Sequence, residues 1–403
     1  MFELHLDMYQ TVGLAAVVFW LGNFLIKKSA LLSKYYIPAP LVGGLIFAIL
    51  NTILTSSGAM TISLDATLQS ILMTVFFTTV GFSASIPLIK WGGKLIVLIL
   101  FVSVVVLTIQ NLIGSSIASL FGIDPRLGIG VGSISLIGGP GTAAAFGATM
   151  EGPIYGVEGA TAVSLAAATF GLVAGSLLGG PAMRKRISQL EQKKQISMNE
   201  VAATKEAREE TIEEDKFETN STRFVHAGML LALALGTGVI VSELLAATGI
   251  TFPGYMGALV MGAVLRNIVE VTGHKYADFE LHTIGEVSLS LFLAMAMMGL
   301  ELWVLADLAI PIIVILITQV LFMFIFSYFI LFNILGKNYD AAVQTAGFIG
   351  YAMGSTSNAM ANMQTITRKY GPSSAAYIAI PIGGTFSDFF NAIIITGFLN
   401  FFT

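Results

Sequence analysis

Residues 135–152 read SLIGGPGTAAAFGATMEG, a stretch that is as apolar as a membrane segment but poorly suited to a continuous helix. Four glycines and one proline fall within its first thirteen residues. Glycine weakens a helix interior and proline interrupts it. Lipid cannot satisfy the backbone groups that such interruptions free, so we expect this segment to be buried in protein or to line a wet cavity.

The composition of the chain places it in a membrane. Of its 403 residues, 55% are hydrophobic and 11% are charged, whereas soluble chains average about 25% charged residues. The chain has no cysteine, and its four histidines lack the i, i+4 spacing of a helical metal pair, so we expect no disulfide and no thiolate or histidine metal site. No nucleophile with a base or a metal is apparent, so we expect no enzyme. The net charge of −4 does not favour nucleic acid as a partner.

Apolar runs divide the chain into ten predicted membrane spans. The N-terminal MFELHLDMYQ has acids but no Lys or Arg before the first run, unlike a signal peptide, so we expect the first span to be retained. The spans are predicted at residues 8–26, 37–54, 68–85, 95–121, 156–181, 224–247, 253–269, 282–300, 308–335 and 373–402.

The basic residues orient these spans. With both termini outside, the loops at 27–36, 86–94, 182–223, 270–281 and 336–372 face the cytoplasm, and Arg126 is the only outer residue among the 20 Lys and Arg. Cytoplasmic loops are enriched in Lys and Arg, which supports this orientation.

Two halves of the chain share landmarks at nearly constant spacing, which favours an internal repeat over chance recurrence of glycine and proline. The pairs are Pro38 and Pro253, Gly81 and Gly299, Gly122 and Gly336, Gly139 and Gly354, and Thr169–Phe170 and Thr385–Phe386. Each half holds five spans, so the second copy is inverted in the membrane, as in many secondary transporters. We expect an all-α integral membrane protein of about ten helices, with repeats at 1–181 and 224–403. The segment 182–223, with nine bases and nine acids, is expected to be a charged cytoplasmic linker, either a solvated helix or partly disordered.

Each repeat is expected to carry a re-entrant hairpin before its last helix, at about 128–152 and 341–370. Because the repeats are inverted, the hairpin tips should meet near mid-membrane, with short helices presenting free N–H groups to an anion such as a carboxylate. Simple tight packing of glycine-rich helices is the alternative. The predicted substrate-binding residues are Gly139, Gly141, Thr142, Ser355, Thr356, Ser357, Asn358 and Asp388.

Asp388 lies deep inside the last predicted span, where an unpaired carboxylate costs about 3 kcal/mol. No base is expected at that depth, so a cation, a substrate ammonium or a proton should compensate it. The nearby Gly383, Gly384 and Thr385 predict a locally unwound helix whose oxygens suit a hard cation. The predicted sodium ligands are Thr385, Ser387, Asp388 and Asn391, and Asn362 either lines the same cavity or caps its helix.

The segments GGPGTAAAFG and GSTSNAMANMQTITRKYGPSSAAYIAIPIGGTFSDFFNA resemble the glutamate:sodium symporter family of bacteria, and the resemblance runs along the whole chain. It implies a homologous fold and sodium-coupled uptake of L-glutamate by alternating access across the bacterial inner membrane, with Na⁺ as the coupling ion and no cofactor. A homodimer is expected by analogy with inverted-repeat transporters. The alternatives are a proton-coupled or sodium-coupled transporter of another small carboxylate, and an ion channel.

Overall fold

The computed structural model describes residues 2–192, 221–248, 252–273, 277–300, 302 and 304–402. Within these ranges the chain is almost entirely helical, and eight helices are long and apolar enough to cross a membrane. They cover Met8–Lys28, Ala39–Ser56, Gly93–Leu120, Ala160–Leu190, Ser221–Ala246, Asp278–Met298, Leu308–Ile334 and Ser374–Phe401. The expectation of an all-α integral membrane protein is confirmed at this level.

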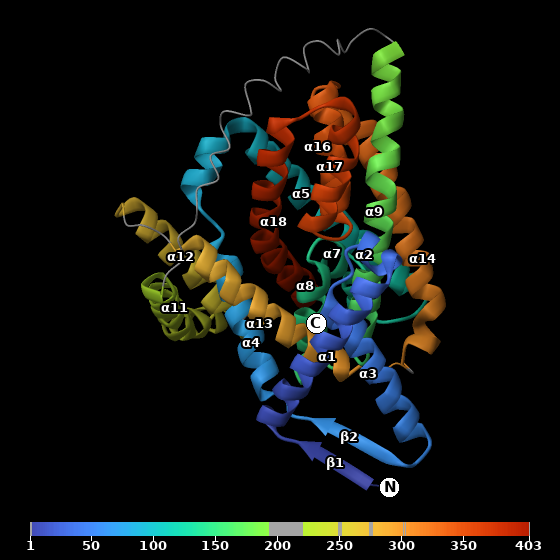
Figure 1. Ribbon diagram of the computed structural model, residues 1–403, viewed down its shortest axis with the longest axis vertical. Helices are drawn as coiled ribbons and strands as arrows, with labels where there is room; N and C mark the ends of the chain where they lie inside the picture. The colour runs from blue at the N-terminus through green and yellow to red at the C-terminus, as the bar shows by residue number, and fades with distance from the viewer. Residues whose placement is uncertain are drawn as a thin grey trace.

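Within the described ranges most helices follow one another with short connections (Figure 1). Their bounds are α1 (Met8–Lys28), α2 (Ala30–Lys34), α3 (Ala39–Ser56), α4 (Thr67–Phe82), α5 (Ile86–Leu120), α6 (Pro125–Gly130), α7 (Ser133–Leu136), α8 (Gly139–Glu151), α9 (Ala160–Gln192), α11 (Ser221–Ala246), α12 (Met256–Val271), α13 (Asp278–Met298), α14 (Val304–Ile325), the π-helix η1 (Phe326–Leu331), α15 (Phe332–Ile334), α16 (Tyr339–Ala352), α17 (Thr356–Tyr370) and α18 (Ser374–Phe401).

Two of the ten predicted spans form shorter helices than expected. Helices α4 and α12 have 16 residues each, or about 24 Å of length, which is less than the ~30 Å hydrocarbon core. They pack directly against each other, because a Cβ built on Gly81 would overlap the carbonyl oxygen of Leu259. The absence of a side chain at Gly81 therefore lets the two backbones touch.

Similar glycine contacts join α1 to α3 and α11 to α12. Between α1 and α3, a Cβ on Gly22 would overlap the backbone of Ala39, and one on Gly43 would overlap that of Val18. Between α11 and α12, Gly238 and Gly257 lie against each other's segments in the same way. Small residues at helix interfaces permit such close approach in membranes.

The helices form two groups in contact. Helix α13 packs on α1, α3 and α4, and α12 packs on α4 and α11, which makes the first group. In the second group, α9 contacts α8, α14, α16 and α17, while α18 packs on α5 and α16. In Figure 1 helices α11 and α12 lie on the left and α9 and α14 on the right, with α16 to α18 above the centre.

A two-stranded parallel sheet was not expected from the sequence. Strand β1 (Phe2–Leu6) pairs with β2 (Met60–Leu64), with Leu4 opposite Ile62. Asn51 of α3 hydrogen-bonds both the N–H and the carbonyl of Ile62, at 3.2 and 3.3 Å, and so occupies the outer edge of β2. Hydropathy predicts only a chain end before residue 8 and a loop between the spans 37–54 and 68–85, and these are the two segments that form the strands.

The predicted linker begins as a helix, one of the two forms expected for it, because α9 continues through Pro181 to Gln192; residues 193–220 lie outside the described ranges. One expectation about helix continuity is wrong. Helix α18 is unbroken from Ser374 to Phe401, so no unwound segment occurs at residues 383–385. The hydroxyl of Thr385 bonds the carbonyl oxygen of Pro381 four residues earlier, which is a helical pattern.

Candidate functional site

Two breaks in the helical backbone face each other at the centre of the molecule. The first lies between α7 and α8, at Gly138 and Gly139, and the second lies between α16 and α17, at Met353 to Ser355. Gly139 has φ of 65°, a conformation that favours glycine. A Cβ added to Gly139 would lie 3.0 Å from the carbonyl oxygen of Gly354, so the two breaks are in close contact.

Both breaks are followed by a helix whose first turn faces the same region. Helix α8 begins at Gly139 and has no side chain capping its N-terminus. Helix α17 begins after Ser355, whose Oγ accepts a hydrogen bond of 3.3 Å from the backbone N–H of Asn358. The remaining N–H groups of these two first turns carry partial positive charge and suit an anionic group.

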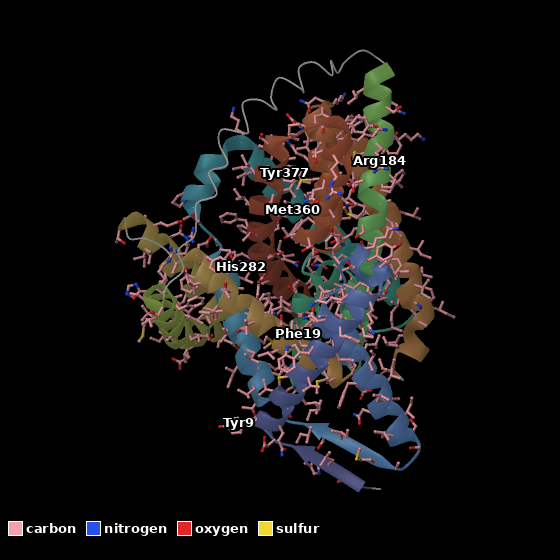
Figure 2. All side chains as sticks on the ribbon, viewed as in Figure 1. Tyr9, Phe19, Arg184, His282, Met360 and Tyr377 are labelled. Atoms are coloured by element: carbon pink, nitrogen blue, oxygen red, sulfur yellow. The ribbon has the colours of Figure 1, made fainter. Side chains whose placement is uncertain are left out.

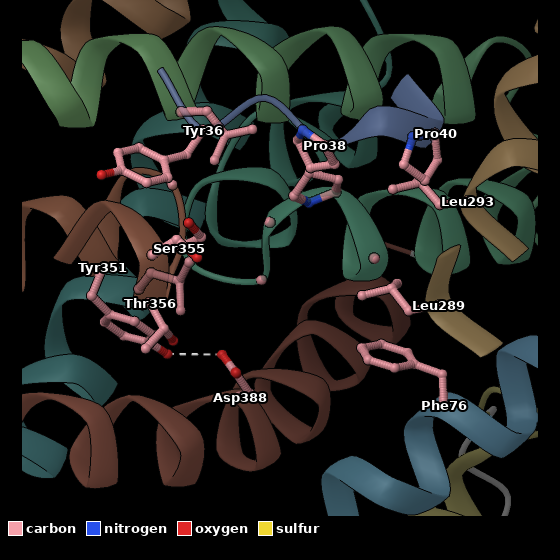
Figure 3. Close-up of a pocket in the computed structure, with 18 of the residues that line it drawn as sticks. Tyr36, Pro38, Pro40, Phe76, Leu289, Leu293, Tyr351, Ser355, Thr356 and Asp388 are labelled. Carbon is pink, nitrogen blue, oxygen red and sulfur yellow. Dashed lines mark hydrogen bonds between the residues drawn. The ribbon is translucent and has the colours of Figure 1, made fainter. Parts of the chain in front are cut away.

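A cavity of about 250 Å³ lies where the breaks meet (Figure 3). Its walls come from both groups of helices, with Phe76 of α4 and Leu289 of α13 on one side. Its full lining is Tyr36, Pro38, Pro40, Phe76, Ile137, Gly138, Gly139, Pro140, Gly141, Leu172, Leu289, Ser290, Leu293, Tyr351, Gly354, Ser355, Thr356, Ser357 and Asp388.

Asp388 supplies the carboxylate of this cavity. The hydroxyl of Tyr351 lies 2.8 Å from Asp388 Oδ1, to which it donates, and 3.0 Å from the carbonyl oxygen of Gly384 (Figure 3). Among the described residues, no Lys, Arg or His forms an ion pair with Asp388. The carboxylate is therefore stabilised by one phenol hydroxyl, and it remains available to a cationic group that enters the cavity.

Most of the predicted substrate-binding residues line the cavity, and two do not. Those that line it are Gly139, Gly141, Ser355, Thr356, Ser357 and Asp388. Thr142 is buried one turn into α8, against Gly138. The side-chain amide of Asn358 donates a 2.7 Å hydrogen bond to the carbonyl oxygen of Leu172 and so ties α17 to α9.

Of the predicted sodium ligands, only Asp388 lines the cavity. Asn391 is engaged with Ser133, accepting from its hydroxyl at 2.7 Å and donating to its carbonyl oxygen at 3.1 Å, which joins α18 to α7. Asn362 donates to the carbonyl oxygen of Gly175 at 3.0 Å. The hydroxyls of Thr385 and Ser387 bond to carbonyl oxygens within their own helix.

Three cavity residues with polar side chains went unnoticed in the sequence. Tyr351 stands three residues before Gly354 in the second break, and a lone phenol next to a glycine-rich break could have been a signal for it. Tyr36 and Ser290 carry no signal that separates them from ordinary interfacial residues. Their positions depend on how α3 and α13 pack, which the local sequence does not specify.

An ion pair lies outside the spanning helices, in the turn between α5 and α6. Asp124 caps α6, and Arg126 donates to both of its carboxylate oxygens, with Nη2 2.6 Å from Oδ2. Partial burial raises the pKa of Asp124, but the hydrogen bonds and the charge of Arg126 outweigh this effect and leave the pKa below its usual value. Arg126, the one base predicted on the outer side, therefore has a local partner.

The cavity lies inside a bundle of apolar spanning helices and is enclosed by polar groups and broken helices. This arrangement is typical of a membrane transport protein. A family model described as "Sodium/glutamate symporter" matches residues 4–372. The sodium/glutamate symporter of Escherichia coli K12 is 40% identical over 399 residues, which cover 98% of each chain, and that of Shigella flexneri matches equally well. The one from Haemophilus influenzae is 36% identical over 389 residues, or 96% of each chain. The chain belongs to the sodium/glutamate symporter family.

Proposed function

We propose that this protein takes up L-glutamate together with sodium ions by alternating access. The relatives named sodium/glutamate symporters cover nearly the whole chain, which supports both the cargo and the coupling ion. The observation that carries the proposal is the cavity where the two breaks meet around Asp388. It offers N–H groups to carboxylates and a carboxylate to a cation in one enclosed space.

The chemistry of the cavity matches the charges of an amino dicarboxylate. Glutamate has two carboxylates, which the first turns of α8 and α17 would bind through N–H groups and through the hydroxyls of Ser355, Thr356 and Ser357. Gly139 and Gly141 let the ligand approach the backbone of α8 closely. Asp388 would accept either the ammonium group of the substrate or a sodium ion.

The proposed sodium site has Asp388 as its charged ligand. Thr385, Ser387, Asn391 and Asn362 would complete an oxygen shell only by exchanging or sharing their present hydrogen bonds. Hydroxyl oxygens keep a lone pair after donating, so Thr385 and Ser387 can share theirs without losing a bond. Thr142 and Asn358 would then support the two helix starts from behind rather than touch the substrate.

The proposed architecture is a pair of inverted five-span repeats, 1–181 and 224–403, each with a re-entrant hairpin. The hairpins would comprise α7 with α8 and α16 with α17. Two features support this reading: Gly22 and Gly43 have counterparts in Gly238 and Gly257, and the glycines that follow α5 and α15, Gly122 and Gly336, both have positive φ. Tips that enter from opposite sides would meet as Gly139 and Gly354 do.

Alternating access would arise from movement of the second group of helices, which carries the breaks and Asp388, against the first. The cavity lies between the two groups, so a shift of one against the other would open it to either side. Both termini would face outside, in a homodimer in the bacterial inner membrane. Glutamate enters as a monoanion against about 2.3 kcal/mol per 100 mV, so inward accumulation needs cotransported cations, and more than one Na⁺ per substrate would make the cycle electrogenic and inward-driven.

Uptake of labelled glutamate into proteoliposomes tests the proposal. Uptake should require an inward sodium gradient and should rise when the interior is made negative. Uptake that follows a proton gradient and ignores Na⁺ would support a proton-coupled carrier instead. Stepwise single-channel currents would support a channel. Asp388→Asn should abolish the coupled transport, with Glu158→Gln as a control that removes one acidic charge from an exposed residue outside the cavity.

A further inference from the structure

A second cavity adjoins the first. It has a volume of about 210 Å³ and lies among the end of α2, the middle of α9 and the second half of α17. Lys34, Ser176, Asn362 and Arg368 are among its lining residues. Of the described residues, Tyr36 alone lines both cavities. Figure 3 places Tyr36 at the edge of the first cavity, on the same side as Ser355.

The second cavity is positively charged. Lys34 and Arg368 face it, and no Asp or Glu is among its lining residues. Neither base forms an ion pair with any described residue. A third base lies beside them, because Arg184 Nη2 is 3.4 Å from the carbonyl oxygen of Thr365, another lining residue; Figure 2 shows Arg184 on α9. The cavity thus offers cationic groups that nothing in the described chain neutralises.

Tyr36, which lines both cavities, has an unusual backbone conformation. Its φ is 54°, in the left-handed region that residues other than glycine rarely adopt. The residue is 46% exposed, so burial does not explain this conformation. Tyr36 lies in the short connection between α2 and Pro38 and lines both cavities. Residues held in rarely populated backbone conformations cluster at functional sites.

We propose that the second cavity is a subsite for the carboxylates of the transported anion, on its path between the first cavity and the cytoplasm. This inference rests on the proposed function and on the orientation given there, and it names Lys34 and Arg368 as the cationic groups. Exposed charge pairs strengthen binding by about 1.4- to 5-fold each, so two bases give a subsite that is attractive and still weak enough to release its ligand.

Exchange in proteoliposomes of uniformly inserted protein tests the subsite. Labelled external glutamate is held saturating while internal glutamate is varied, and then the two sides are reversed. Lys34→Gln with Arg368→Gln should raise the half-saturating internal concentration about fivefold and leave the external value unchanged. Lys28→Gln with Lys369→Gln removes the same charge from residues that line neither cavity, and it should change neither value.

Each other outcome has a definite meaning. Lys34→Arg with Arg368→Lys keeps the charge and should restore the internal value, which separates a charge effect from misfolding. An unchanged internal value, an equal rise on both sides, or an equal rise in the control pair overturns the subsite. An effect seen only in vesicles that contain an anionic phospholipid, and absent in phosphatidylcholine alone, assigns the cavity to a lipid headgroup and also overturns it. Sodium-dependent exchange by the wild-type protein is measured first. If the wild-type protein shows none, the proposed function fails, and the variants do not bear on the subsite.

Discussion

Replacing Gly139 by alanine tests whether the contact between the two helix breaks is needed for substrate binding. An alanine at φ of 65° costs about 1–2 kcal/mol, because its Cβ crowds the following carbonyl oxygen. The same Cβ would stand 3.0 Å from the carbonyl oxygen of Gly354 and would push the second break away by a few tenths of an ångström. We therefore expect both a loss of stability and a wider cavity.

Gly122→Ala supplies the matched control. Gly122 has φ of 70°, so alanine costs a similar 1–2 kcal/mol there, but nothing lies within 4 Å of its Cβ position. Thermal unfolding in detergent should show comparable destabilisation of the two variants. Glutamate uptake should show a half-saturation raised about tenfold or more in Gly139→Ala alone, since displacement of binding groups by less than 1 Å already has large effects. Wild-type uptake by Gly139→Ala, or an equal defect in Gly122→Ala, would refute the reasoning.

Three further predictions concern other parts of the molecule. Tyr351→Phe removes the 2.8 Å hydrogen bond that competes with a cation for Asp388, so the half-saturating sodium concentration of uptake should fall severalfold; an unchanged value contradicts this role. Asp124→Asn removes a carboxylate whose pKa is lowered by Arg126. The stabilisation by this carboxylate is present above the usual pKa of 3.8 and is lost as the pH falls through the lower pKa of the native state. The variant should therefore melt at a lower temperature than wild type at neutral pH and at the same temperature at such acidic pH, and a difference that stays constant with pH would disprove this role. Gly81→Ala forces α4 off the backbone of α12 and should cost about 1–3 kcal/mol in thermal unfolding, and a wild-type melting temperature would argue against that contact.

Much of the candidate site could be anticipated because its chemistry is local. Glycine-rich breaks and a lone intramembrane aspartate are visible in any apolar sequence, and Gly139, Ser355 and Asp388 do line one cavity. The assignment of oxygen ligands around Asp388 was less successful. In a continuous helix Ser387 points away from the face of Asp388 and donates to the carbonyl oxygen of Gly383. Asn391 lies one turn after Asp388, but its amide is already paired with Ser133.

The features of the fold that depend on local sequence could also be predicted, whereas those that depend on tertiary packing could not. Each of the ten predicted spans falls on a helix, but only eight helices of the described ranges are long and apolar enough to cross a membrane, and α4 and α12 have just 16 residues each. The pair Gly383 and Gly384 suggested a break that tertiary packing overrides: Ile99 lies over Gly383 and the ring of Tyr351 over Gly384. The β1–β2 sheet escaped prediction because parallel pairing joins segments more than fifty residues apart.

The unequal chemistry of the two cavity walls has a consequence for transport speed. The polar atoms come mainly from the helices that hold Gly139, Ser355 and Asp388, whereas Phe76, Leu289 and Leu293 present hydrocarbon from the opposite side. A cargo that is hydrogen-bonded to one wall and only in van der Waals contact with the other can travel with the first wall without breaking directional bonds. Dispersion contacts with this hydrocarbon surface are weak and non-directional, so they change little as one wall slides past the other. The free-energy barrier to this movement therefore need not rise with the number of hydrogen bonds between the substrate and the polar wall.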